Sequence, residues 1–251
     1  MGLAHQNKRP KLMLKIDAHQ HFWLYNPERD SWITDDMKVI RKDFLPADLE
    51  TVLAENKIEA CIAVQSDQSA IENFFQINNS LENDFILGVV GWINLQAYDI
   101  DEQLSYLSNF TRLKGFRHVL QGEKNRALML TNKFMNGISM LNKYNFTYDI
   151  LIFPDQLQYA KQLAEKFPHQ KFVIDHIAKP YIKDKKIDGW KKDIMAFTKL
   201  ENVYCKVSGM VTEADWEKWK QEDFTPYLDV VTETFGMKRL MFGSDWPVFL
   251  V

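Results

Sequence analysis

Short runs of apolar and β-branched residues recur at regular intervals along this chain of 251 residues. Eight of these runs have the length and composition of strands. They begin at Lys15, Cys61, Ile86, Leu113, Phe146, Lys171, Val203 and Arg239. The starts lie about 32 residues apart on average, which is close to the length of one strand–helix unit in a (β/α)8 barrel.

Segments with apolar residues at helical spacing separate the predicted strands. One begins at Pro46, and another follows Pro154 and places its apolar residues on one face. Alternation of strands and helices predicts parallel strands with the helices outside. An open doubly wound sheet shares this alternation but carries a glycine-rich phosphate loop after its first strand, and no such loop is present. The pattern therefore predicts a (β/α)8 TIM barrel.

The predicted barrel is a single domain over residues 15–251, and we expect residues 1–14 to be a loosely ordered leader. Because the eighth predicted strand is followed almost at once by Val251, we expect the last helix to be missing. The flank between strands eight and one would then be uncovered. The chain would be a fragment, or the leader or a partner would cover the flank, and the exposed apolar surface would favour a homo-oligomer.

Composition and charge exclude several functional classes. The net charge of −3 provides no basic field to hold nucleic acid. The N-terminus lacks the apolar region of a signal peptide, and no apolar stretch approaches the ~18 residues of a membrane span, so we expect a cytoplasmic protein without membrane contact. The two cysteines, Cys61 and Cys205, lie within apolar runs and are interpreted as buried thiols.

Polar side chains gather at the carboxyl ends of four predicted strands. His19 and His21 end the first strand, and because strand residues alternate between faces, both point the same way. The other three strands contribute Arg117 with His118, His176 with its neighbour Asp175, and Asp245. Active sites of such barrels lie at this end, and buried charges are costly unless they have a use. The sequence therefore predicts an active site there.

Several motifs, in this order, resemble one known family. They read IDAHQHFW, VVGWINL, KGFRHVLQ, FVIDHIAKP, VYCKVSGMVTEADW and RLMFGSDWPV. Together they resemble the amidohydrolase-related (amidohydrolase 2) family, which includes sugar-lactone hydrolases of the L-fuconolactonase and L-rhamnonolactonase type. The resemblance runs from about Lys15 to Val251. It implies a (β/α)8 barrel of the amidohydrolase superfamily and a hydrolase that opens the lactone ring of a small sugar-derived substrate.

The resemblance also implies a set of metal ligands, namely His19, His21, His176 and Asp245. In the wider superfamily the fourth strand often carries a lysine that bridges two metals, and the fifth carries a histidine. Here the fourth strand offers Arg117-His118, and the fifth reads YDILI without a histidine. The pattern therefore resembles a site for one zinc-type divalent ion, or one that works without a metal.

Lactone hydrolysis is acyl transfer to water, and it needs a base, a group that stabilises the oxyanion and an acid for the leaving alkoxide. We assign Asp245 as the base that activates water. Arg117 is the fixed cation for the oxyanion or for a substrate carboxylate, because a guanidinium stays charged. His19, His21 and His176 either hold the ion or donate hydrogen bonds to the substrate carbonyl.

A further group of residues is predicted to contact the substrate. It consists of Trp23, Trp92, His118, Tyr148, Lys179 and Trp246. The aromatic residues would flank a sugar ring, although packing in the core is the alternative for each. Lys179 is either a substrate contact or a solvated loop lysine, and His118 either relays a proton or faces outward. Alternative functions are a metal-dependent decarboxylase or amide hydrolase on the same barrel, and a truncated non-catalytic homologue.

Overall fold

The computed structural model describes residues 14–251, in which eight parallel strands form one sheet in the order of the sequence. The strands are β1 (Ile16–Gln20), β2 (Ala60–Val64), β3 (Ile86–Gly91), β4 (Leu113–His118), β5 (Thr147–Ile150), β6 (Phe172–Ile174), β7 (Val203–Val207) and β8 (Leu240–Phe242). The predicted leader lies outside the described residues except for Leu14. The eight predicted strands are all present, and the TIM-barrel prediction is confirmed.

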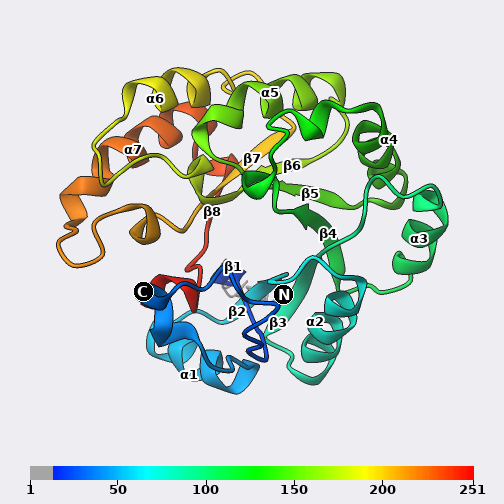
Figure 1. Cartoon of the computed structure of the whole chain (residues 1–251), viewed down its shortest axis with the longest axis horizontal. Coiled ribbons are helices and arrows are strands. Elements are labelled where there is room, and N and C mark those ends of the chain that lie inside the picture. Colours follow the sequence, from blue (N-terminus) through cyan, green and yellow to red (C-terminus); the bar gives the residue numbers. More distant parts are fainter. Residues whose placement is uncertain (1–13) are drawn as a thin grey trace, which may run out of the picture.

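Residues 14–251 contain seven α-helices. Figure 1 shows these helices outside the strands. They are α1 (Pro46–Glu55), α2 (Ala70–Glu82), α3 (Ile100–Leu107), α4 (Asn132–Leu141), α5 (Leu157–Lys166), α6 (Asp188–Met195) and α7 (Gln221–Phe235). Short 3-10 helices are η1 (Asp35–Ile40), η2 (Leu120–Gly122), η3 (Leu128–Leu130), η4 (Asn142–Tyr144), η5 (Pro154–Gln156), η6 (Asp175–Ala178), η7 (Val211–Glu213), η8 (Met237–Arg239) and η9 (Val248–Leu250). Within residues 14–251, none of the helices is long and apolar enough to cross a bilayer.

The predicted helical faces pack against the barrel. Leu49 and Leu53 of α1 are buried, and so are the apolar residues of α5 on the predicted face. These side chains belong to one continuous apolar core that also includes residues of the strands. Burial of this core is the main favourable contribution to folding and fixes the strands as a rigid frame for the residues at their ends.

The barrel closes between its first and last strands through a short backbone contact. The amide of Asp245 donates a hydrogen bond to the carbonyl oxygen of His19 (2.8 Å), and the amide of His21 donates one to Trp246 (2.7 Å). An isolated parallel bridge joins Gln20 and Trp246. These bonds place the segment after β8 directly against β1, so residues more than 200 positions apart in sequence become neighbours.

The strands end earlier than the apolar runs predict. His176 lies just after β6, where four consecutive residues, His176 to Lys179, have φ between 48° and 60°. This left-handed backbone is unfavourable for residues other than glycine and ends the extended conformation at once. Asp245, with φ of 63°, likewise lies beyond β8. Both side chains therefore stand on tight turns at the rim of the barrel rather than on the strands.

Candidate active site

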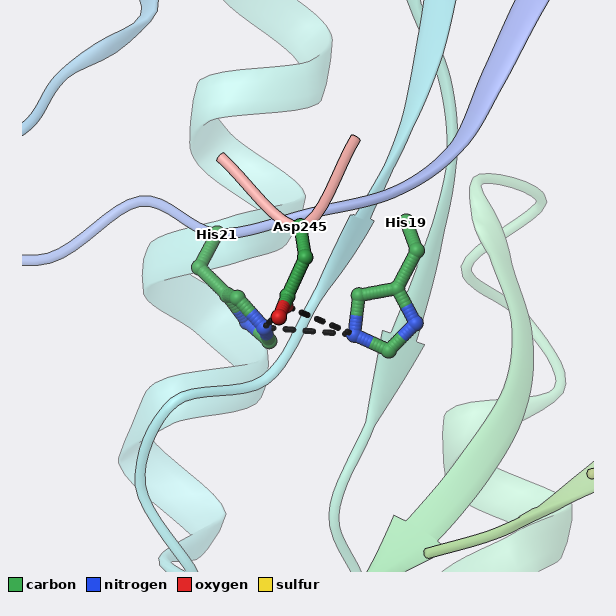
Figure 2. Close-up of side chains that lie close together, drawn as sticks. All are labelled: His19, His21 and Asp245. Carbon is green, nitrogen blue, oxygen red and sulfur yellow. Dashed lines mark hydrogen bonds and ion pairs between the residues drawn. The ribbon is translucent and has the colours of Figure 1, made fainter. Parts of the chain in front are cut away.

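His19 and His21 face the same point at the carboxyl end of β1, as their spacing predicts. Both side chains are buried, and their Nε2 atoms lie 3.2 Å apart. Asp245 faces them, with its Oδ1 atom 3.8 Å from Nε2 of His19 and 3.4 Å from Nε2 of His21. Figure 2 shows the three side chains converging from β1 and from the segment after β8.

The Nδ1 atom of each ring faces an oxygen atom that can accept a proton but carries none. Nδ1 of His21 donates to the carbonyl oxygen of Val64 (2.8 Å), and Nδ1 of His19 lies 3.4 Å from Oδ1 of Asp175. A neutral imidazole carries one proton, so its other nitrogen presents a lone pair. Both Nε2 lone pairs therefore face the carboxylate of Asp245, and Nη1 of Arg117 is a donor 3.2 Å from the Nε2 atom of His19.

Backbone contacts hold Asp245 in this position. Oδ1 of Asp17 on β1 accepts hydrogen bonds from the amides of His19 (3.0 Å) and Ser244 (2.9 Å), which ties β1 to the segment after β8. Gly243 permits the close approach, because a Cβ atom at that position would lie 2.6 Å from Cβ of His19. A side chain at residue 243 would therefore push the two halves of the site apart.

His176 reaches the site from the left-handed turn after β6. Its Nδ1 atom lies 2.9 Å from the hydroxyl oxygen of Ser208, and its Nε2 atom lies 3.9 Å from Oδ1 of Asp245. Gly209 lies against the ring, since a Cβ atom there would be 2.5 Å from Nδ1 of His176. Ser208 and Gly209, which follow β7, thus fix how His176 faces the site.

Arg117 lies at the base of the site on β4, with only 4% of its surface exposed. Its Nη1 atom donates to Oδ2 of Asp175 (3.1 Å) and lies 3.2 Å from Nε2 of His19, while Nη2 donates to the carbonyl oxygen of Gln65 (2.6 Å). These partners hold the guanidinium in place as a fixed positive charge. It is the residue of the predicted Arg117-His118 pair that enters the site.

Burial and neighbouring groups shift the protonation of the site. Burial lowers the pKa of His176 to about 4, and it also lowers that of His19 well below its ordinary value. Burial alone would raise the pKa of Asp245, but the nearby His176, His21 and His19 outweigh it, and the pKa falls below its ordinary value. At neutral pH the site therefore contains an ionised carboxylate beside neutral His19 and His176.

The geometry of His19, His21 and Asp245 fits one small divalent cation. Zinc bonds to nitrogen and oxygen at about 2.0–2.1 Å, so two ligand atoms of a tetrahedral zinc lie about 3.3–3.4 Å apart. The three separations observed here are 3.2, 3.4 and 3.8 Å. A cation would also give the converging lone pairs a partner. His176 does not share this triangle of ligand atoms; it groups instead with His19 and Asp175.

The site opens into a cavity of about 310 Å³. Six of the predicted site residues line it, namely His21, Trp23, Arg117, His176, Lys179 and Asp245. Lys179 pairs with Glu213 at 3.0 Å, and Trp23 donates its indole N–H to the carbonyl oxygen of Lys42 (2.8 Å). The cavity is large enough for a single sugar-sized ring, and charged and aromatic side chains surround it.

The other four predicted substrate contacts do not line this cavity. Tyr148 and Trp246 are buried among aromatic side chains of the core. Trp92 and His118 face each other, with the indole nitrogen 3.4 Å from Nδ1 of His118, and His118 also pairs with Glu123 at 2.7 Å. Adjacent strand residues face opposite ways, which explains why Arg117 enters the site and His118 does not.

Several residues that the sequence did not assign to the site lie in or beneath the cavity. Arg29, Trp32, Ser66, Asp67, Gln68 and Gln121 line its wall. Asp149, Asp175 and Lys206 form a buried ionic cluster below it. A signal for this cluster exists, because Asp149 and Lys206 are single charged residues within the apolar runs YDILI and VYCKV. The wall residues lie on loops and carry no comparable pattern.

The chain was compared with known families and proteins. The family model described as Amidohydrolase matches residues 16–251. An L-fucono-1,5-lactonase from Burkholderia multivorans is 35% identical over 248 residues, which cover 95% of this chain and 83% of that protein. An L-fucono-1,5-lactonase from Burkholderia ambifaria is 30% identical over 240 residues, or 94% of this chain and 81% of that protein.

The fold is also similar to that of a solved structure. A crystal structure of an amidohydrolase from Burkholderia multivorans with bound zinc superposes with a TM-score of 0.90 and 36% sequence identity. The match covers 95% of this chain and 86% of that chain.

Proposed function

This chain belongs to the amidohydrolase family and is a hydrolase, and on that premise we propose that it hydrolyses the ring of a sugar-derived lactone, with Asp245 activating the water. The observation that carries the proposal is the convergence of His19, His21 and Asp245 on one point, of which His21 and Asp245 line the cavity. The names of the relatives support a lactone as the substrate. They do not favour a decarboxylase, an amide hydrolase or a non-catalytic homologue.

We assign His19, His21 and Asp245 as the residues that hold one zinc-type ion. The bound zinc in the similar Burkholderia structure supports this assignment, and so do the three ligand separations. A divalent ion lowers the pKa of water that it binds towards about 7 and polarises a carbonyl group. His176 remains free to bind the substrate, since its ring is neutral and Ser208 fixes Nδ1.

Asp245 accepts a proton from the attacking water and returns it to the leaving group. The water oxygen forms a bond to the lactone carbonyl carbon while its proton passes to the carboxylate of Asp245. The ring C–O bond then breaks, and the proton moves from Asp245 to the departing alkoxide oxygen, which gives the hydroxy acid. A carboxylate with a lowered pKa is a weak base towards bulk water, so this step depends on water that the site has made more acidic.

Arg117 and Lys179 supply positive charge on the two sides of the reacting carbonyl. Arg117 is held rigidly by Asp175 and Gln65 at the base of the cavity and stabilises negative charge that develops there. Lys179 lies at the rim and pairs with Glu213 at 3.0 Å. An ammonium group has three N–H donors, so Lys179 can donate further hydrogen bonds to substrate hydroxyls. Trp23 provides an apolar wall against one face of the ring.

The test is proton release from a panel of lactones, measured with a pH indicator. The panel contains L-fucono-1,5-lactone, L-rhamnono-γ-lactone and an aromatic lactone, and a resorcylic acid is included to detect decarboxylation. The proposal predicts turnover of at least one aldonolactone above the spontaneous rate and no loss of the resorcylate. A folded, zinc-loaded protein that hydrolyses no lactone would refute the proposal.

A further inference from the structure

At the base of the active site, four charged side chains from β4, β5, β7 and the turn after β6 form one ionic cluster. Lys206 on β7 is 3% exposed and pairs with Asp149 on β5 and with Oδ1 of Asp175, after β6, at 3.1 Å. Asp175 in turn pairs through Oδ2 with Arg117 on β4, also at 3.1 Å. The two positive and two negative groups balance, although Lys206, Asp149 and Asp175 do not line the cavity.

Asp175 links this cluster to two residues of the site. One of its oxygens contacts Arg117, and the other lies 3.1 Å from Lys206 and 3.4 Å from Nδ1 of His19. The carboxylate is thereby held with one oxygen on each side. An arginine and a carboxylate prefer a two-pronged contact in which both oxygens bind the guanidinium. Without Lys206, the 3.4 Å contact with Nδ1 of His19 would be left on the Oδ1 side to oppose a turn of Asp175 towards Arg117.

Burial of these charged groups costs free energy, so a gain in stability alone does not explain the cluster. Burial disfavours the charged form of Lys206 and by itself would lower its pKa. The negative charges of Asp149 and Asp175 outweigh burial, so the pKa of Lys206 lies above its ordinary value. Replacement of a buried ion pair by neutral side chains of similar volume is often neutral or stabilising. A role in the reaction accounts better for these four charges, because one of them is Arg117 of the site and another, Asp175, contacts His19.

We propose that Lys206 is a positioning residue: by holding Oδ1 of Asp175, it keeps Arg117 and His19 in their working orientation. Lys206 does not line the cavity, and its direct contact towards the site is with Asp175. The inference rests on the proposed lactonase function for its kinetic consequence, whereas its structural consequence, the state of the His19 ring, is independent of any substrate.

The test separates positioning from stability with a double variant. In D149N/K206M, two neutral side chains replace the buried ion pair of Asp149 and Lys206. The ion pair of Arg117 and Asp175 remains, so the buried charges still sum to zero. We expect the melting temperature to stay within a few degrees of wild type and kcat on L-fucono-1,5-lactone to fall about 10- to 100-fold with KM changed less than about threefold. If kcat stays within twofold of wild type in this stable variant, Lys206 is structural only and the proposal is wrong.

D149N alone is the matched control, because it keeps the contact between Lys206 and Asp175. We expect this variant to retain kcat within about threefold of wild type. Lys206 loses its ion pair with Asp149 but keeps its contact with Oδ1 of Asp175. A loss in D149N as large as in the double variant would contradict the proposal. If D149N/K206M fails to fold, D149N/K206L, which removes the same contact with Asp175 and keeps the same charge balance, is judged by the same fall in kcat.

A second readout needs no turnover. In protein with ¹⁵N-labelled histidine, long-range ¹H–¹⁵N spectra report which ring nitrogen of His19 carries the proton. The proposal predicts a proton on Nδ1 in wild type and in D149N, and an altered Nδ1 signal in D149N/K206M. An unchanged His19 signal in the double variant refutes the positioning role. If wild type hydrolyses no lactone, the proposed function fails, and this spectrum still decides the role of Lys206.

Discussion

The Nε2 atoms of His19 and His21 lie 3.2 Å apart, although neither ring is placed to donate a proton to the other. The carbonyl oxygen of Val64 holds the proton of His21 on Nδ1, and Asp175 faces Nδ1 of His19. With Asp245 alongside, three electron-rich atoms meet in a buried place. Nη1 of Arg117 lies 3.2 Å from Nε2 of His19, and a metal cation between the three atoms would give His21 and Asp245 a partner as well, because buried acceptors lose their bonds to water.

Removal of one of these ligands should weaken metal binding. We expect His21→Ala to lower zinc affinity about 100-fold or more at neutral pH, because two of the three converging ligands cannot hold the ion as tightly. Isothermal titration with zinc, with the metal content of the purified protein measured in parallel, checks this. His118→Ala is the control, since His118 pairs with Glu123 outside the site and should leave zinc affinity unchanged. Equal affinity in all three proteins would contradict the assignment.

The position of His176 should depend on the absence of a side chain at residue 209. We expect Gly209→Ala to reduce kcat about tenfold or more, because the new Cβ atom would lie 2.5 Å from Nδ1 of His176 and displace the ring. Its φ of 59° adds strain of about 1–2 kcal/mol for a residue other than glycine. Kinetic assays and thermal melts of the same samples measure the two effects separately.

Gly236→Ala separates the clash at His176 from backbone strain. Gly236 has φ of 62°, but no atom lies within 4 Å of the position of its added Cβ. This variant should lose stability comparable to that of Gly209→Ala and keep wild-type kcat. If both variants lose activity equally, the effect comes from instability, and Gly209 has no special role in placing His176.

Both cysteines should be unreactive in the folded protein. Burial raises the pKa of the thiols of Cys61 and Cys205 well above their ordinary value, so almost no thiolate is present at pH 8. We expect Ellman's reagent to modify neither thiol in native protein within an hour and both after unfolding in guanidinium. Rapid modification of a native thiol would show that one of these strands opens readily.

The barrel and the two histidines of β1 were predictable from the sequence, because both depend on local pattern. Strand and helix periods define the fold, and His19 and His21 lie on one face of any strand. The left-handed turn after β6 was not predictable in the same way. Ile177 and Ala178 have no preference for positive φ, so tertiary contacts must impose that backbone.

The orientation of large aromatic side chains was also not predictable from the sequence. Tyr148 and Trp246 lie close in sequence to site residues, yet their rings turn into the core. Which way a large aromatic side chain points is decided by the space between elements, and no local period records it. Trp32 lines the cavity instead, from a loop whose path depends on contacts with the rest of the barrel.

The central claim is that Asp245 activates the attacking water, and kcat for Asp245→Asn at matched zinc occupancy tests it most directly. Asparagine keeps the size of the side chain but cannot take the proton. With Asp155→Asn, an exposed carboxylate paired with Arg126, as the control, we predict a fall in kcat on L-fucono-1,5-lactone of about 10²–10⁴-fold for Asp245→Asn and less than twofold for the control. Hydrolysis by zinc-loaded Asp245→Asn within about tenfold of wild type would contradict the account.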